Sequence, residues 1–192
     1  MDKILFVDAC PRPSSRTREL AEALLEKLPA PAEEVRLYEA PPSLLDMAGL
    51  GAREEAVKRQ DVNAPCLAAA RRFAEADIIV IAAPYWDLMF PAALKLYLES
   101  IMVAGVTFRY TAEGRPEGLC RARALYYVTT AGGFIGQNDF GFSYVQALSG
   151  MLGIRTASRV AAEGLDILGA DVDAILRAAK DSITLDDTPK GE

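Results

Sequence analysis

Three short segments of this chain carry residue types that bind ligands, and each follows a stretch with the character of a β-strand. The first is Ser14-Ser15-Arg16-Thr17, at the start of an amphipathic helix. Free backbone N–H groups and the helix dipole attract anions to the N-terminus of a helix. The serine and threonine hydroxyls and the arginine guanidinium add further hydrogen-bond donors there. A terminal phosphate monoester suits this turn, whereas simple N-capping by Ser15 is the alternative interpretation.

The second segment is PYWDLMF at 84–90, which directly follows the apolar run IIVIAA. A fully apolar strand indicates burial on both faces, as in a parallel sheet, and the loop that leaves such a strand is where ligands bind. Tyr85, Trp86, Asp87 and Leu88 would then be displayed in that loop, where backbone N–H groups reach the edge of a heterocycle while Trp86 or Leu88 packs on its face. The alternative is a loop whose aromatic side chains cover the core.

The third segment runs from Thr129 and Thr130 through Ala131 to the pair Gly132-Gly133. Paired glycines allow the backbone to approach a ligand closely. An ordinary glycine turn is the alternative.

The remaining pattern predicts the elements that must position these segments. Strands are expected at 3–8, 34–39, 77–83, 122–130 and 154–164, and helices at 17–28, 65–76, 91–103, 142–152 and 170–183. Five strands that alternate with helices predict an α/β fold with a doubly wound parallel sheet. Periodicity leaves the strand order open between flavodoxin-like and Rossmann-like. In either order, the three segments leave strands at one edge of the sheet, which suggests a flavin mononucleotide (FMN) site at a switch point.

Three stretches fall outside this alternation. Residues 40–64 mix turn residues with short helical pieces and predict a long excursion, and 104–119 predict an inserted hairpin or flap. We expect one domain over 1–183 and a frayed tail over 184–192.

Composition narrows the classes of function. The formal net charge of −6 argues against a nucleic-acid partner, and no run of about 18 apolar residues indicates a membrane span. Three cysteines without a CxxC motif favour reduced thiols and a cytoplasmic protein. The chain has no histidine, which excludes Ser-His-Asp and Cys-His catalysis and His-ligated metals, and we expect no metal site. Neither a GxGxxG nor a P-loop motif is present.

Two strings also make the chain recognisable: AAPYWDLMFPAALKLYLESIMVAGVTFRYTAEGRPEGL at 82–119 and VTTAGG at 128–133. In them the chain resembles the flavodoxin-like NAD(P)H quinone reductases, and among these the FMN-dependent NADH-azoreductases. The resemblance implies a five-stranded flavodoxin-like fold, non-covalent FMN, NADH or NADPH as donor, a homodimer, and two-step hydride transfer to a quinone, azo compound or nitroaromatic. FMN would carry the hydride, so no side chain need be a dedicated acid or base.

The resemblance also implies a set of site residues. The cofactor-binding positions are Cys10, Ser15, Arg16, Thr17, Tyr85, Trp86, Asp87, Leu88, Thr130, Ala131, Gly132 and Gly133. Phe108 and Tyr110 on the flap are expected to contact substrate in a partner's pocket, with packing inside one subunit as the alternative.

Three of these positions depart from the azoreductase pattern. Asp87 replaces a neutral amide, and a carboxylate there would lower the potential of the flavin. Cys10 stands where serine is common, and Ala131 where arginine is frequent. These departures keep open a flavin-free binding or regulatory relative. A flavodoxin-type electron carrier also stays open because the aromatic loop is compatible with it, although the flap at 104–119 argues against it.

Overall fold

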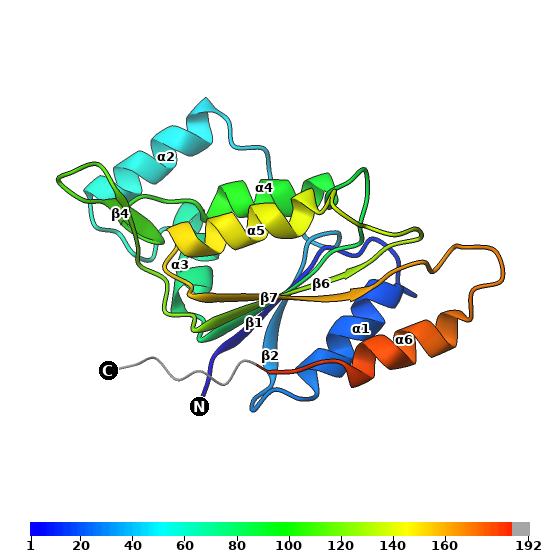
Figure 1. Ribbon diagram of the computed structural model, residues 1–192. Coiled ribbons are helices and arrows are strands. Elements are labelled where there is room, and N and C mark those ends of the chain that lie inside the picture. Colours follow the sequence, from blue (N-terminus) through cyan, green and yellow to red (C-terminus); the bar gives the residue numbers. More distant parts are fainter. Residues whose placement is uncertain (186–192) are drawn as a thin grey trace.

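The central sheet has five parallel strands, and it confirms the predicted doubly wound α/β class (Figure 1). The computed structural model describes residues 1–185. Its strands are β1 (Ile4–Asp8), β2 (Ala32–Arg36), β3 (Ile78–Ala82), β6 (Ala124–Thr130) and β7 (Thr156–Ala162). Their spatial order, β2-β1-β3-β6-β7, is flavodoxin-like and decides the question that periodicity left open.

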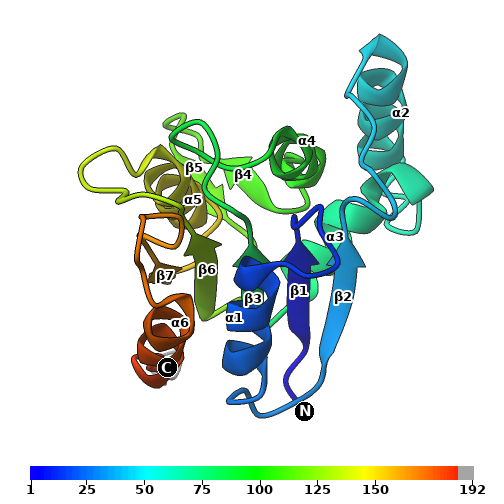
Figure 2. The same cartoon turned by 90° about the vertical axis from the view of Figure 1, so that its right-hand side faces the viewer.

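Helices cover both faces of the sheet (Figure 2). α1 (Arg16–Leu25) and α6 (Val172–Asp181) pack on one face. α3 (Ala68–Glu75), α4 (Ala92–Ile101) and α5 (Phe140–Met151) pack on the other. All five were expected from the sequence, with boundaries that differ by a few residues.

Alternation along the strands divides the core between these two layers. In β1, Ile4 and Phe6 face α1 and α6, whereas Leu5 and Val7 face α3 and α4. All five residues of β1 are buried, and the same holds for β3. Burial on both faces is why these strands read as continuous apolar runs.

The segment 40–64 contains a regular helix that the sequence analysis missed, α2 (Met47–Lys58). Asp46 caps it by accepting the N–H of Gly49 at 2.8 Å. The guanidinium of Arg53 donates to the carbonyls of Glu99 (3.1 Å) and Ser100 and so ties α2 to α4. The apolar pattern of α2 is weak and two glycines interrupt it, so tertiary contacts rather than propensity determine this helix.

The boundaries of the elements on either side of α2 also differ from those expected from the sequence. β2 lies two to three residues earlier than the expected 34–39. A short 3-10 turn, η1 (Pro65–Leu67), precedes α3.

The predicted flap is confirmed as an antiparallel hairpin of β4 (Phe108–Tyr110) and β5 (Pro116–Gly118). Its base packs on the end of α5, where a Cβ on Gly118 would lie 2.0 Å from the backbone nitrogen of Gly153. Only glycine allows this approach of two backbones. The hairpin is therefore anchored at its base.

The predicted tail, 184–192, lies outside the described residues except for its first two. Over residues 1–185, none of the helices has the length and apolar character needed to cross a membrane.

Candidate functional site

A cavity of about 460 Å³ opens at the edge of the sheet where β1, β3 and β6 end. Figure 2 shows the loops that leave these strands gathered at this edge. The cavity is lined by the loop before α1, the loop after β3, the loop after β6 and the loop after β7: Pro11, Arg12, Ser14, Ser15, Arg16, Thr17, Pro84, Tyr85, Trp86, Thr130, Ala131, Gly132, Leu165 and Asp166. All three predicted segments thus line one cavity.

One end of the cavity is the start of α1. Ser15 is the N-cap, and its Oγ accepts the N–H of Arg18 at 3.3 Å. The Oγ1 atoms of Thr17 and Thr130 lie 2.6 Å apart and join α1 to the end of β6, and Thr17 is only 1% exposed. The first N–H groups of a helix have no partner within the helix, and the Oγ of Ser15 accepts only that of Arg18. Ser15 can therefore cap the helix while other N–H groups at the same end remain as donors for a ligand.

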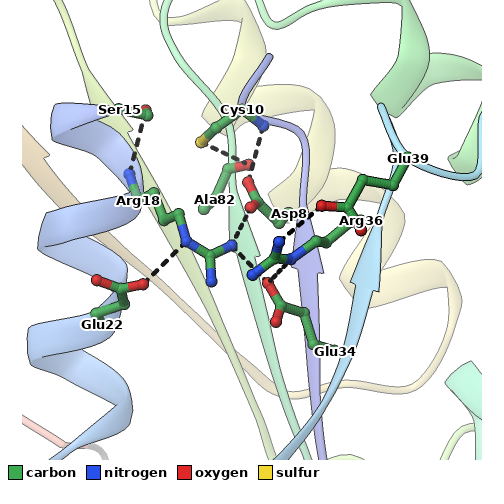
Figure 3. A network of polar contacts seen from close by, with 9 residues as sticks. All are labelled: Asp8, Cys10, Ser15, Arg18, Glu22, Glu34, Arg36, Glu39 and Ala82. Atoms are coloured by element: carbon green, nitrogen blue, oxygen red, sulfur yellow. Dashed lines mark hydrogen bonds and ion pairs between the residues drawn. The ribbon is translucent and has the colours of Figure 1, made fainter. Parts of the chain in front are cut away.

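The arginines near this end have different surroundings. Arg12 and Arg16 line the cavity, and Nη1 of Arg16 lies 3.0 Å from Oδ1 of Asp166. Arg18 points away, toward the buried carboxylate of Asp8 and toward Glu34 (Figure 3). Hydrogen bonds to Glu34 and Asp8 raise the pKa of Arg18. Arg18 is thus engaged in ion pairs away from the cavity, while Arg12 and Arg16 are the arginines that line it.

Cys10 lies behind the cavity rather than among its lining residues. Its N–H donates to Oδ1 of Asp8 at 2.8 Å, and its Sγ lies 3.9 Å from the carbonyl oxygen of Ala82 (Figure 3). Burial raises the pKa of the Cys10 thiol, which stays protonated at neutral pH. The structure therefore places this predicted cofactor contact in a supporting position, in which Asp8 fixes the backbone that leads into the loop.

The aromatic end of the cavity is held by backbone and side-chain hydrogen bonds. The N–H of Tyr85 donates to the carbonyl of Thr130 at 3.0 Å. The hydroxyl of Tyr85 donates to the carbonyl of Asn138 at 2.9 Å. Trp86 is the only tryptophan of the chain and is 42% exposed. Tyr85 and Trp86 both line the cavity.

Asp87 and Leu88 form the tip of a tight turn next to the cavity, outside its lining. Trp86 and Met89 exchange two backbone hydrogen bonds, of 3.1 and 2.8 Å. The φ angles of Asp87 (49°) and Leu88 (68°) are both positive, as in a type I′ turn. Asp and Asn tolerate this conformation better than other side chains, so the backbone supplies a reason for Asp87 that is independent of its charge.

The glycine segment is joined to the loop that follows β7. The N–H groups of Gly164, Leu165 and Asp166 donate to the carbonyls of Gly133 (2.9 Å), Ala131 (3.1 Å) and Gly132 (2.9 Å). Ala131 and Gly132 line the cavity and Gly133 does not.

Sequence reasoning missed Leu165 and Asp166. The predicted topology could have indicated them, because the loop after the fifth parallel strand lies at the same edge of the sheet as the other three loops.

The two flap aromatics have different surroundings. Phe108 is 8% exposed and packs in the core of its own chain, whereas Tyr110 is 61% exposed. Their rings meet edge to face with centroids 5.6 Å apart. The substrate role predicted for this pair stays a prediction, and Tyr110 has the more accessible ring.

Comparison with known proteins fits this geometry. Residues 2–184 match a family described by its flavodoxin-like fold. The chain belongs to this flavodoxin-like family.

Its relatives include two named FMN-dependent NADH:quinone oxidoreductases. That of Clostridium acetobutylicum, whose name carries the number 2, is 36% identical over 92% of this chain and 94% of its own. That of Lachnoclostridium phytofermentans is 36% identical over 96% and 98%. Among solved structures, an azoreductase from Bacillus anthracis matches with a TM-score of 0.82 and 26% identity, over 94% of this chain and 96% of that one.

Proposed function

We propose that this protein is an FMN-dependent NADH:quinone oxidoreductase that also reduces azo compounds. The observation that carries the proposal is the cavity at the carboxyl ends of β1, β3 and β6, which has a cationic, hydroxyl-lined end and an aromatic end. FMN has the matching pair of groups, a phosphate and a flat ring system. The names of the relatives point to the same cofactor and the same class of substrate.

The residues at the two ends of the cavity fit FMN. Ser15, Arg16 and Thr17 would hold the phosphate at the start of α1, with Arg12 as a second cation. Tyr85 and Trp86 would border the ring system from one side, and Thr130, Ala131 and Gly132 from the other. At Gly132 the space that a side chain would take is filled by the carboxylate of Asp166, since a Cβ there would lie 2.4 Å from Oδ2.

Bound FMN would supply the chemistry of hydride transfer between NADH and the quinone or azo compound. The protein supplies position and a partly apolar surrounding. The loops that border the ring are tied to one another by the bond between the N–H of Tyr85 and the carbonyl of Thr130. A cofactor that carries the hydride explains how a chain without histidine acts as an enzyme.

We also propose that the active form is a homodimer in which a second copy covers the mouth of the cavity. Large apolar side chains are exposed around it, on the loops and at the first residue of α5: Trp86, Leu88, Phe134, Phe140, Ile167 and Leu168. The side chains of Phe134 and Ile167 both lie beside Gly164, within 3.4 Å of the place where its Cβ would be. Grouped exposed apolar side chains mark an interaction surface. The exposed Tyr110 of the flap would contribute its ring to this interface.

The test is steady-state oxidation of NADH with menadione as acceptor, using protein with and without bound FMN. The proposal predicts turnover that requires both FMN and the quinone, and NADPH in parallel assays reports the preference for the donor. Protein that binds FMN but does not oxidise NADH would contradict the proposed enzymatic activity and favour a flavodoxin-type electron carrier. Failure to bind FMN at all would favour a flavin-free relative.

A further inference from the structure

An ion pair between Arg16 and Asp166 lies at the cationic, hydroxyl-lined end of the cavity. Arg16 is the first residue of α1, and Asp166 lies in the loop after β7, so 150 residues separate them in sequence. Nη1 of Arg16 lies 3.0 Å from Oδ1 of Asp166, and both residues line the cavity. The carboxylate therefore meets the guanidinium at the place where the proposed function puts a phosphate.

Asp166 is held in this position by its backbone. Its N–H donates to the carbonyl of Gly132 at 2.9 Å, and its carboxylate lies over the Cα of Gly132. Two further hydrogen bonds, from Gly164 and Leu165, fix the same loop against the glycine segment. The loop thus presents the carboxylate to Arg16, while the side chain itself is 73% exposed to solvent.

The energetics favour exchange of the carboxylate for a phosphate. An exposed ion pair contributes little to stability, so breaking it costs little. A phosphate dianion carries more charge than a carboxylate and also reaches the N–H groups at the start of α1. A phosphate and the Asp166 carboxylate cannot both lie against Arg16 without repelling each other.

We propose that Asp166 is an internal competitor for the flavin phosphate at Arg16, so that it lowers the affinity for FMN and makes the cofactor exchangeable. The proposal rests on the proposed function, since it assumes that FMN places its phosphate at Arg16. Asp166 acts through Arg16 and takes no part in the chemistry.

The experiment measures dissociation constants for FMN and for riboflavin, which lacks the phosphate, by quenching of flavin fluorescence. The proposal predicts that Asp166→Asn tightens FMN binding by about 2- to 5-fold, the range of an exposed ion pair, and leaves riboflavin unchanged. Glu54→Gln, which removes an exposed carboxylate on α2, is the matched control for net charge and leaves both constants unchanged.

A double-mutant cycle with Arg16→Gln tests whether the effect passes through Arg16. Competition predicts that Asp166→Asn loses most of its effect on FMN once Arg16 is replaced. An equal gain in both backgrounds would contradict competition and indicate direct repulsion. Weaker FMN binding by Asp166→Asn would also overturn the inference, because Asp166 would then hold Arg16 in place for the phosphate.

Failure of the proposed function gives a different result. Wild-type protein that binds no FMN, or binds FMN and riboflavin equally and is insensitive to Arg16→Gln, would contradict the phosphate site itself and the inference with it. Wild-type protein that prefers FMN, with an unchanged constant in Asp166→Asn, would contradict the inference alone.

Discussion

At the scale of single residues, the turn at Asp87 and Leu88 separates the roles of charge and conformation. Both residues have a positive φ, which Asp and Asn adopt at lower cost than Leu. An amide and a carboxylate at position 87 are therefore equivalent for the turn. They differ in charge, and the turn lies next to the aromatic end of the cavity.

Replacing Asp87 by asparagine should raise the midpoint potential of bound FMN, because it removes a negative charge that disfavours the reduced, anionic flavin. The fold and the turn should be unaffected. The potential is measured by equilibration with a reference dye, and an unchanged value would place Asp87 away from the flavin ring.

Leu88→Gly should give a larger free energy of unfolding than Leu88→Ala, by about 1 kcal/mol, because glycine adopts a positive φ without strain. The alanine variant is the matched control, since it shortens the side chain and keeps the strained backbone. Urea denaturation of the flavin-free protein measures both. Equal stability of the two variants would show that the turn is not strained at Leu88.

At the scale of elements, the loop between β6 and α5 is held by charged side chains on β7 and directly after it. Oε2 of Glu163 accepts the N–H of Ile135 at 2.9 Å. Arg159 on β7 pairs with the carboxylate of Asp139, the N-cap of α5, at 2.6 Å. Backbone hydrogen bonds to β7 and the loop after it involve residues 131–133 of this loop, so these side chains help to position its later part beside the cavity.

Glu163→Ala should speed amide hydrogen exchange at Ile135 by about fivefold, which corresponds to loss of one partly exposed hydrogen bond. Exchange in β1 should not change, which provides the internal control. Unaltered exchange at Ile135 would mean that the loop is held without Glu163.

Much of the fold could be read from the sequence because its signals are local. The apolar runs of β1 and β3 and the repeat of Leu20 and Leu24 on α1 directly reflect burial. α2 was missed because its helix depends on the contact of Arg53 with carbonyl groups on α4, which no local pattern shows.

The candidate site could also be predicted in part from the sequence. Eight of the twelve predicted cofactor positions line the cavity, because loops at the carboxyl ends of parallel strands share one edge of the sheet: Ser15, Arg16, Thr17, Tyr85, Trp86, Thr130, Ala131 and Gly132. Cys10, Asp87, Leu88 and Gly133 lie beside it, since spacing does not tell which way a loop residue points. The pairing of Arg16 with Asp166 joins residues far apart in sequence, which no local pattern reveals.

At the scale of the whole molecule, the exposed apolar side chains around the cavity predict a dimer. Leu168 is fully exposed, with a relative accessibility of 102%. A charge at this position would have to be desolvated in an interface, whereas it costs nothing on a free surface.

Leu168→Glu should therefore shift the mass in sedimentation equilibrium from dimer to monomer at micromolar protein. Its circular dichroism should match that of the wild type, which serves as the control for folding. A wild-type protein that sediments as a monomer would refute the proposed homodimer.

The central claim is that FMN in this cavity takes electrons from NADH and gives them to a quinone. The most direct measurement mixes FMN-loaded protein with equimolar NADH in the absence of oxygen, follows the visible absorbance of the flavin, and then adds menadione. The account predicts that NADH bleaches the bound flavin and that menadione restores its colour in full. Flavin that stays oxidised in the presence of NADH would contradict it.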